Sequence, residues 1–242
     1  MPDSLNRERA PWHSDIETWV FDLDNTLYPP RSNLFAQIDQ RMGAFIAGLL
    51  NVAPQEAKRI QKEYYRVHGT TLHGLMVEHG VDPHSFLSFV HDIDHSPIEP
   101  DPALGAMLGE LPGRKFVLTN GSVAHADAVM DRLGIADHFE DVFDIVAADF
   151  KPKPDRAPYE KFLGLHGIDP RHAAMFEDLP RNLEVPKQLG MATVLVVDHE
   201  NPQSGSRSAW EVAGADAGHI DHITGDLAQF LADIVAPPVK AL

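Results

Sequence analysis

Two aspartates, Asp22 and Asp24, directly follow an apolar stretch that begins at Trp19. The density of apolar residues predicts a strand buried on both faces. Because side chains alternate along a strand, residues two positions apart point the same way, so both carboxylates can reach one site at its carboxyl end. Two carboxylates so close repel each other, and a shared proton or a divalent cation would offset the repulsion. The alternative for this motif alone is a surface turn in which residues 24–26 only cap a bend.

Further polar residues lie at or between the ends of other predicted strands. Ligands of open α/β sheets bind outside the carboxyl ends of the strands, so these side chains converge if the strands are neighbours. Carboxylates suit Mg²⁺, while a hydroxyl, a lysine and loop N–H groups can bind a phosphate. An aspartate beside the metal could attack phosphorus and form an aspartyl phosphate. The residues are Thr119, Asn120 and Gly121 after 115–119, Glu177 and Asp178 after 173–176, and the lysines Lys151 and Lys153 between them.

The elements that must position these residues form an alternating pattern from residue 101 onwards. Strands and helices in alternation predict an α/β fold, a Rossmann-like parallel sheet with helices on both faces. Residues 198–218 have weak periodicity and are not assigned. We expect helices at 101–111, 122–133, 155–166, 181–189 and 226–235, and strands at 19–21, 115–119, 142–147, 173–176 and 192–197.

Between the first strand and this alternating region the pattern is helical. Apolar residues recur at helical spacing from residue 33 to about residue 95, and prolines at 29–30 and 97–102 interrupt the chain on either side. We therefore expect a small α-helical cap domain at 31–97, inserted after the first strand. The α/β core would then be discontinuous, made of 1–30 and 98–242.

In this order the polar segments resemble the four motifs of the haloacid dehalogenase (HAD) superfamily, and the helical insert resembles that of its helical-cap branch. The segments are Asp22-Leu23-Asp24-Asn25-Thr26, Thr119-Asn120, Lys151 and Glu177-Asp178. The resemblance covers the whole chain. The four motifs together are specific, although each alone is weak.

The resemblance implies a role for each motif residue. Asp22 would be the nucleophile. Asp24 would be the general acid, protonating the leaving oxygen and later activating water. Lys151 would bind substrate and stabilise charge, selected over Lys153 by the family's Lys-Pro-x-Pro pattern. The remaining roles would be phosphate binding by Thr119, Asn120 and Gly121, Mg²⁺ binding by Asp22, the Asp24 carbonyl and Asp178, support of the metal by Glu177, and contact with these ligands by Asn182.

Within the superfamily the chain most resembles pyrimidine 5′-nucleotidases. This likeness rests on residues 21–28, on 64–71 followed by Gly74-Leu75, and on 91–94. It implies that Tyr65, His68 and Thr71 of the cap contact the substrate. The alternative is that residues near Tyr65 pack inside the cap and that His68 only places a charge at a helix end.

Composition limits the partners. The chain has 242 residues, a formal net charge of −16 and no cysteine. So acidic a surface disfavours nucleic acid and anionic membranes, and the lack of cysteine excludes disulfides and thiolate chemistry. The first residues contain no apolar signal core, and no apolar run reaches the ~18 residues of a membrane span, so we expect a cytoplasmic protein. Its expected partner is a small phosphorylated metabolite.

The sequence therefore predicts a Mg²⁺-dependent phosphomonoesterase, a 5′-nucleotidase acting on UMP or CMP. Phosphatases of phosphoglycolate or of a sugar phosphate, and phosphomutases, remain open because they use the same acid at Asp24. A dehalogenase is disfavoured, since a halide leaving group needs no acid. From a different class, a non-catalytic metabolite-binding protein is the remaining alternative. The oligomeric state is not predicted.

Overall fold

The computed structural model describes residues 11–198 and 218–236. In this part of the chain six parallel strands form one sheet in the order β3-β2-β1-β4-β5-β6, which confirms the predicted Rossmann-like α/β fold. The strand that leads to Asp22 lies in the middle of the sheet, between β2 and β4. The strands are β1 (Thr18–Phe21), β2 (Arg114–Leu118), β3 (Asp141–Phe143), β4 (Ala173–Glu177), β5 (Ala192–Val196) and β6 (His222–Thr224).

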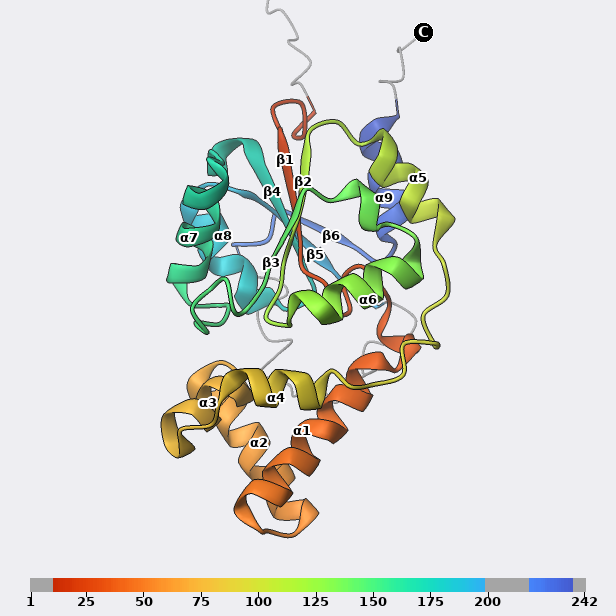
Figure 1. Ribbon diagram of the computed structural model, residues 1–242. Coiled ribbons are helices and arrows are strands. Elements are labelled where there is room, and N and C mark those ends of the chain that lie inside the picture. Colours follow the sequence, from red (N-terminus) through yellow and green to blue (C-terminus); the bar gives the residue numbers. More distant parts are fainter. Residues whose placement is uncertain (1–10, 199–217, 237–242) are drawn as a thin grey trace, which may run out of the picture.

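Alternating side chains of β1 serve both faces of the sheet. Trp19 and Phe21 pack on one side with buried residues of three core helices, and Val20 packs on the other side with residues of two more. Burial on both faces explains why this strand reads as continuously apolar. Figure 1 shows the two helical layers. The first is α5 (Pro102–Glu110), α6 (Val123–Leu133) and α9 (Leu227–Val235), and the second is α7 (Arg156–His166) and α8 (Glu184–Leu189).

Helix α6 starts almost at once after β2, and local chemistry sets both of its ends. The Ser122 side chain accepts a hydrogen bond from the backbone N–H of His125, so it caps the first turn. At the other end Gly134 adopts a φ of +73° and its N–H bonds back to the last turn, a conformation that glycine takes without strain. The loop 119–122 is thus fixed between a strand and a capped helix.

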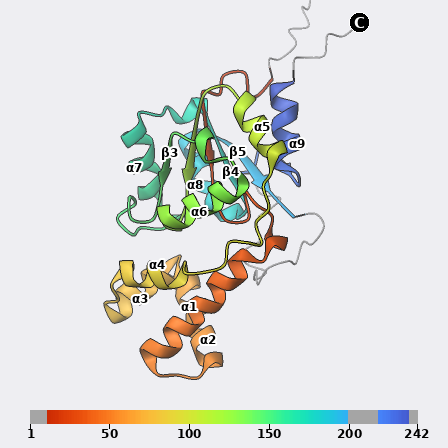
Figure 2. The same ribbon diagram turned by 45° about the vertical axis from the view of Figure 1, so that its right-hand side comes forward.

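Four helices from the segment between β1 and α5 lie beyond the carboxyl ends of the strands (Figures 1 and 2). They share an apolar core of their own, to which the core loop residue Ile145 also contributes. We call them the cap; the boundaries of a separate domain at 31–97 remain a prediction. The cap helices are α1 (Leu34–Leu50), α2 (Pro54–His68), α3 (Thr71–His79) and α4 (Pro83–Val90).

Two local predictions need correction, and one strand was missed. The strand predicted at 142–147 spans Asp141–Phe143, because the Asp144 side chain accepts hydrogen bonds from the N–H groups of Val123 and Ala147 and turns the chain. The helix predicted at 181–189 is a 3-10 turn followed by α8, which places Pro186 in the first turn, where proline is tolerated. Strand β6 was not predicted. The unassigned residues 199–217 lie outside the described part of the chain.

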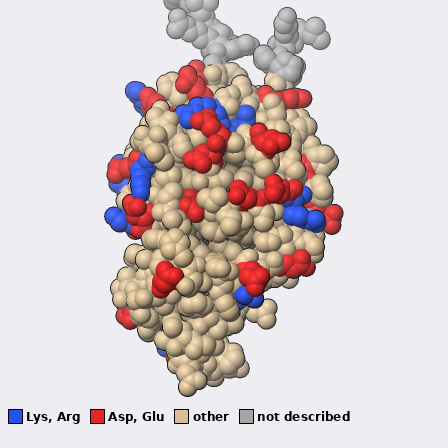
Figure 3. Space-filling model, in the orientation of Figure 1, with Lys and Arg blue, Asp and Glu red and all other residues tan. Residues whose placement is uncertain are grey.

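The surface agrees with the acidic composition. On the face shown in Figure 3 acidic and basic side chains are interspersed over the core, while most of the surface over the cap carries neither. Among the described residues no helix combines the length and the apolar character that crossing a membrane requires.

Candidate active site

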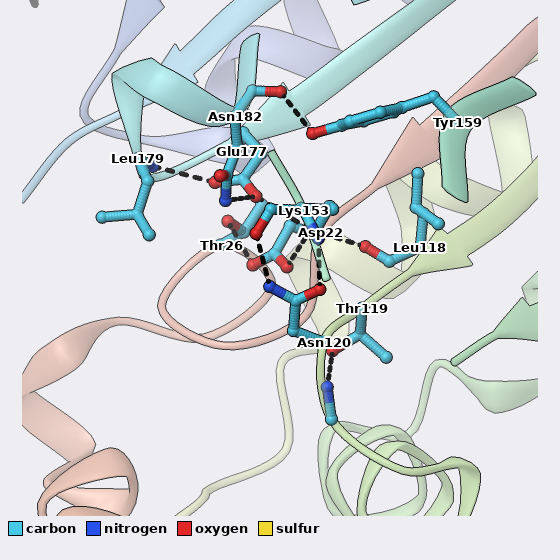
Figure 4. Close-up of polar contacts among 11 residues, drawn as sticks. Asp22, Thr26, Leu118, Thr119, Asn120, Lys153, Tyr159, Glu177, Leu179 and Asn182 are labelled. Carbon is cyan, nitrogen blue, oxygen red and sulfur yellow. Dashed lines mark hydrogen bonds and ion pairs between the residues drawn. The ribbon is translucent and has the colours of Figure 1, made fainter. Parts of the chain in front are cut away.

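The site lies where β1, β2 and β4 end. Phe21 pairs with Val117 of β2 and with Phe176 of β4, so the residues that follow these strands meet at one edge. The backbone N–H of Asp22 donates to the Phe176 carbonyl at 2.9 Å, which continues the β1–β4 pairing by one residue. Asp22 is therefore fixed at the centre of the edge, as Figure 4 shows.

Lys153 is the lysine of this site. Its Nζ donates to Asp22 Oδ1 at 2.6 Å, to Glu177 Oε1 at 2.8 Å and to the Leu118 carbonyl at 2.7 Å (Figure 4). The residue is only 1% exposed. Burial lowers the pKa of Lys153, but the Asp22 and Glu177 carboxylates outweigh this effect and raise it above its ordinary value. The ammonium is therefore charged at neutral pH.

The sequence predicted Lys151 as the site lysine, but the structure places Lys153 there instead. Lys151 is exposed, whereas Lys153 lines the cavity beside Asp22. The physical reason is the side chain of Asn120, which accepts from the backbone N–H of Lys153 at 2.8 Å and donates to its carbonyl at 3.2 Å. These two bonds tie the backbone of residue 153 to the end of β2. Asn120, predicted to bind phosphate, thus also holds the lysine in place.

The pKa values of the two carboxylates that share Lys153 shift in opposite directions. Burial, together with the charges of Glu177 and Asp24, raises the pKa of Asp22 to about 7 against the opposing effect of Lys153. Burial also raises the pKa of Glu177, but Lys153 and the hydrogen bonds from Leu179 and Asn182 outweigh it and hold this pKa below its ordinary value. A cation bound beside Asp22 would favour its ionised form.

A metal ion fits this edge of the site. Ligand oxygens of Asp22, Glu177 and Asp178 lie within 4.8 Å of one another, and all three residues are buried. Lys153 pairs with two of these carboxylates, Asp22 and Glu177. Asn182 Oδ1 is buried and has no hydrogen-bond partner among the described residues, so it can accept from water bound to such an ion. Oxygen ligands of this kind suit Mg²⁺.

The side chain of Asp24 points away from this acidic cluster. Its Oδ1 accepts from the Tyr28 hydroxyl at 2.5 Å and from His125 Nε2 at 2.9 Å. Burial raises the pKa of Asp24, but His125 and the hydrogen bonds from His125 and Tyr28 outweigh it and hold this pKa below its ordinary value. Asp24 was predicted to bind the metal through its main-chain carbonyl. Its side chain is therefore available for a different role.

The loop after β2 supplies a hydroxyl and an open space. Thr119 is 3% exposed, and its Oγ1 accepts from the backbone N–H of Gly121 at 2.9 Å. Its own proton therefore remains available to a ligand. A Cβ at residue 121 would lie 3.3 Å from Thr119 Oγ1 and 3.8 Å from Asp24 Oδ2, so the glycine leaves the space before both groups free.

A cavity of about 210 Å³ joins this site to the cap. Of the predicted cap residues, Tyr65 and Thr71 line it and His68 does not; His68 lies 3.4 Å from Glu78 instead. Tyr65 also lies against the Arg181 guanidinium of the core, 4.6 Å from ring centre to Cζ. Thr71 donates to the Gln61 carbonyl at 3.4 Å, a contact within the cap.

Several residues of the site were not predicted from the sequence. In the cavity wall Gln61 donates to Asp39 Oδ1 at 2.8 Å, and Lys62 binds the same oxygen at 3.0 Å. Asp39 lies in α1, whereas Gln61 and Lys62 lie in α2, so the three residues form a polar patch only when the two helices pack together. Tyr28 follows Asp24 by four residues, but nothing in the sequence links His125 to Asp24, because their meeting depends on how α6 packs beside β1.

Similarity to known proteins identifies the family of this chain. A family profile described as haloacid dehalogenase-like hydrolase matches residues 16–190. Over 197 residues the chain is 27% identical to Phosphate metabolism protein 8 of Saccharomyces cerevisiae, covering 74% of this chain but only 61% of that protein. The L-2-haloacid dehalogenase of Xanthobacter autotrophicus has a similar structure, with a TM-score of 0.55, 17% identity, and 90% of this chain and 98% of that chain covered.

A second solved relative is the HAD-hydrolase YfnB of Bacillus subtilis, whose structure holds magnesium. Its TM-score is 0.52 at 13% identity, with 92% of this chain and 99% of that chain covered. Likenesses at such low identity show the shared fold alone. The profile, in contrast, covers more than half of the chain and includes the ends of β1, β2 and β4. The chain therefore belongs to the haloacid dehalogenase-like hydrolases.

Proposed function

We propose that this hydrolase cleaves small phosphate monoesters through a covalent intermediate on Asp22, and that its substrate is a pyrimidine nucleoside 5′-monophosphate. The observation that carries the proposal is Asp24. Its carboxylate lines the cavity two residues after the nucleophile, with Oδ1 held by Tyr28 and His125 and with Oδ2 facing open space beside Gly121. An alkoxide leaving group needs a proton from such an acid, whereas a halide does not.

The proposed reaction has two steps. In the first step the substrate monoanion gives its proton to Asp24 and the Asp22 carboxylate attacks phosphorus; the electron pair of the broken P–O bond leaves with the ester oxygen, which takes that proton from Asp24. In the second step Asp24 takes a proton from water, whose oxygen attacks phosphorus and breaks the bond to Asp22. Inorganic phosphate leaves with the proton from Asp24, so both carboxylates return to the ionised state. Lys153, held against Asp22, stabilises the charge that gathers on the phosphoryl oxygens.

The residues present fit a divalent cation held by Asp22, Asp178 and the support of Glu177. When bound, Mg²⁺ would neutralise charge on the phosphoryl group and on the nucleophile. Thr119 Oγ1, whose proton is available, and the backbone N–H of Asn120 would bind the remaining oxygens. Support comes also from YfnB, whose structure holds magnesium, and from the printed name of the yeast relative, which refers to phosphate metabolism.

A nucleoside as leaving group fits the cap side of the cavity. Apolar side chains of α1 and α4, among them Phe35, Phe86 and Leu87, offer surface for a ring system. Asp39 and Gln61 offer hydrogen-bonding groups in the same wall. A buried polar wall discriminates between bases because a wrong base leaves its groups unpaired.

The experiment is a substrate panel with the purified protein: pyrimidine and purine nucleoside monophosphates, phosphoglycolate, sugar phosphates, p-nitrophenyl phosphate and L-2-chloropropionate. We expect phosphate release with a preference for UMP or CMP, lost on adding EDTA and restored by Mg²⁺. Chloride release without phosphatase activity would overturn the proposal in favour of a dehalogenase. Phosphate release with a preference for another ester would support the proposal of a phosphatase and contradict the proposal of a nucleotidase.

Replacing Asp178 should weaken metal binding more than chemistry. Asp178→Ala removes one carboxylate of the cluster but leaves Asp22 and Glu177. We expect the Mg²⁺ concentration for half-maximal activity to rise about tenfold or more, because each supporting ligand contributes substantially to metal affinity, with partial recovery at high Mg²⁺. A Mg²⁺ titration of initial rates measures this. An unchanged half-maximal concentration would show that Asp178 is not a ligand.

The cap variants Tyr65→Ala and His68→Ala form a matched pair. Tyr65 lines the cavity and His68, three residues on in the same helix, does not. Tyr65→Ala should therefore raise KM for UMP about threefold to tenfold, as expected for one lost apolar contact, and erode the preference over AMP. His68→Ala should leave both nearly unchanged. Equal losses with UMP and p-nitrophenyl phosphate in the Tyr65 variant would mean that Tyr65 only supports the cap against Arg181.

A further inference from the structure

Three histidines from separate parts of the chain meet beside Asp24. His125 lies in α6 and is 1% exposed. The ring of His91, the residue that ends α4, stacks on it with 4.6 Å between ring centres and 8° between planes. His95, four residues further along the linker to the core, places Nε2 at 3.3 Å from His125 Nδ1. His91 is also fixed by a 2.9 Å hydrogen bond between its Nδ1 and Ser122 Oγ.

The hydrogen bonds around Asp24 distinguish its two oxygens. Both donors, the Tyr28 hydroxyl and His125 Nε2, bind Oδ1. No hydrogen bond to Oδ2 is found in the part of the chain that the structure describes. Oδ2 is also the oxygen that faces the space left by Gly121. The carboxylate is thus anchored through one oxygen and presents the other to the cavity.

One orientation of the His125 ring serves the whole chain of contacts. With a hydrogen on Nε2, His125 donates to Asp24 Oδ1, while its Nδ1 faces His95 Nε2 on the other side of the ring. The contact to His95 therefore helps to fix the ring orientation in which Nε2 reaches Asp24. This is the same logic by which a third group orients the base of a catalytic triad.

We propose that His125 is a positioning residue that anchors Oδ1 of Asp24 so that Oδ2 exchanges the proton with the substrate, and that His91 and His95 of the cap linker hold His125 in this orientation. The inference rests on the proposed function for the reaction that it serves. Because two of the three histidines belong to the segment that leaves the cap, the alignment of the acid depends on the position of that segment. A displaced linker would leave Asp24 anchored by Tyr28 alone.

The simpler alternative is that the three rings only fill space between α6 and the linker. The two readings differ in what the loss of His125 does to different esters. A poor leaving group needs a proton from Asp24, whereas a nitrophenolate does not. The value of kcat/KM reports the first step, up to release of the alcohol, and is independent of the later attack by water. A space-filling role would lower kcat/KM for all esters alike.

The experiment measures kcat/KM for UMP, phenyl phosphate, p-nitrophenyl phosphate and dinitrophenyl phosphate in the Mg²⁺-loaded protein. Because general acid catalysis contributes about 10²-fold to 10⁴-fold, His125→Ala should lose about 30-fold or more with UMP and about threefold or less with dinitrophenyl phosphate. His125→Gln, whose amide N–H can reach the position of Nε2, should recover most of the loss. His125→Asn, one methylene shorter, should not. His95→Ala should show the same pattern at smaller amplitude.

His166→Ala is the matched control. His166 also lies in a core helix and packs on aromatic rings, 4.6 Å from that of Phe116, but it does not line the cavity. We expect any decrease in kcat/KM caused by His166→Ala to be the same for every ester. The inference is overturned if His125→Ala likewise lowers kcat/KM for all esters by the same factor, or if His125→Gln recovers no more activity than His125→Asn. Either result leaves the proposal of a phosphatase unaffected.

Crystal structures of the parent and of His125→Ala add a readout that does not depend on turnover. We expect the Asp24 side chain to be turned or disordered in the variant and ordered in the parent. An unchanged Asp24 side chain in the variant would overturn the inference, even if the parent proves to hydrolyse no phosphate ester. Absence of activity in the parent, in contrast, counts against the proposed function alone.

Discussion

Asp22→Asn is expected to fold normally and to lose about four orders of magnitude in kcat, the scale seen when a nucleophile that acts with its partners as a unit is removed. The amide has nearly the shape of the carboxylate. Its oxygen can still accept from Lys153, and its NH2 group can donate to the Thr26 hydroxyl, which now donates to the other oxygen of Asp22. It is, however, too poor a nucleophile to attack phosphorus. Steady-state kinetics with UMP and circular dichroism measure the two halves of this prediction.

The control for this variant is Asp137→Asn, the same substitution at an exposed residue outside the cavity. Its activity should equal that of the parent. Acid quenching of the parent during turnover should in addition trap phosphate on the protein, and Asp22→Asn should trap none. Near-normal turnover by a folded Asp22→Asn protein would eliminate the covalent mechanism.

The second large effect is expected at Lys153 and not at Lys151, two residues away. Lys153→Met keeps the length of the side chain but removes the ammonium beside Asp22 and Glu177. We expect kcat to fall about 10³-fold, the upper range for loss of one preorganised electrostatic group. Lys151→Met, at an exposed residue, should cost less than about twofold, as surface substitutions usually do.

The same pair predicts a difference in stability. Removing one partner of a buried ion pair leaves the other uncompensated, so Lys153→Met should lower the free energy of unfolding by about 3 kcal/mol, measured by urea denaturation near neutral pH. Lys151→Met should leave it unchanged. If Lys151→Met instead shows the larger loss of kcat, the motif spacing identified the lysine correctly and the buried network is structural only.

This lysine shows where sequence reasoning stops. The alternation rule placed Asp22 and Asp24 at the end of a buried strand, and the strand–helix alternation placed two further groups at the same edge of the sheet. Both predictions depend on the periodicity of apolar residues and on the order of the elements, which can be read directly from the sequence. The choice between Lys151 and Lys153 depends on the side chain of Asn120 bonding the backbone of residue 153, a contact across 33 positions that no spacing reveals.

The other gaps have related causes. Strand β6, His222–Thr224, has three residues, too few for a period to be recognised, and is defined by its pairing with β5. The end of β3 was placed too late because the apolar residues 145–147 continue the strand pattern after Asp144 has turned the chain. His125 and Gln61 lie in well-predicted helices, but the neighbours that give them a role come from other helices and from the linker.

The central position of β1 has a consequence for how the chain is made. Its two partners begin at residues 114 and 173, so a growing chain leaving the ribosome cannot complete the hydrogen bonds of β1 until some 155 residues later. The cap helices, whose contacts are mostly among neighbours in sequence, can form long before that. The nascent protein thus carries an apolar strand with at least one unpaired edge until β4 has been made, and the Asp22 carboxylate at its end stays accessible until then.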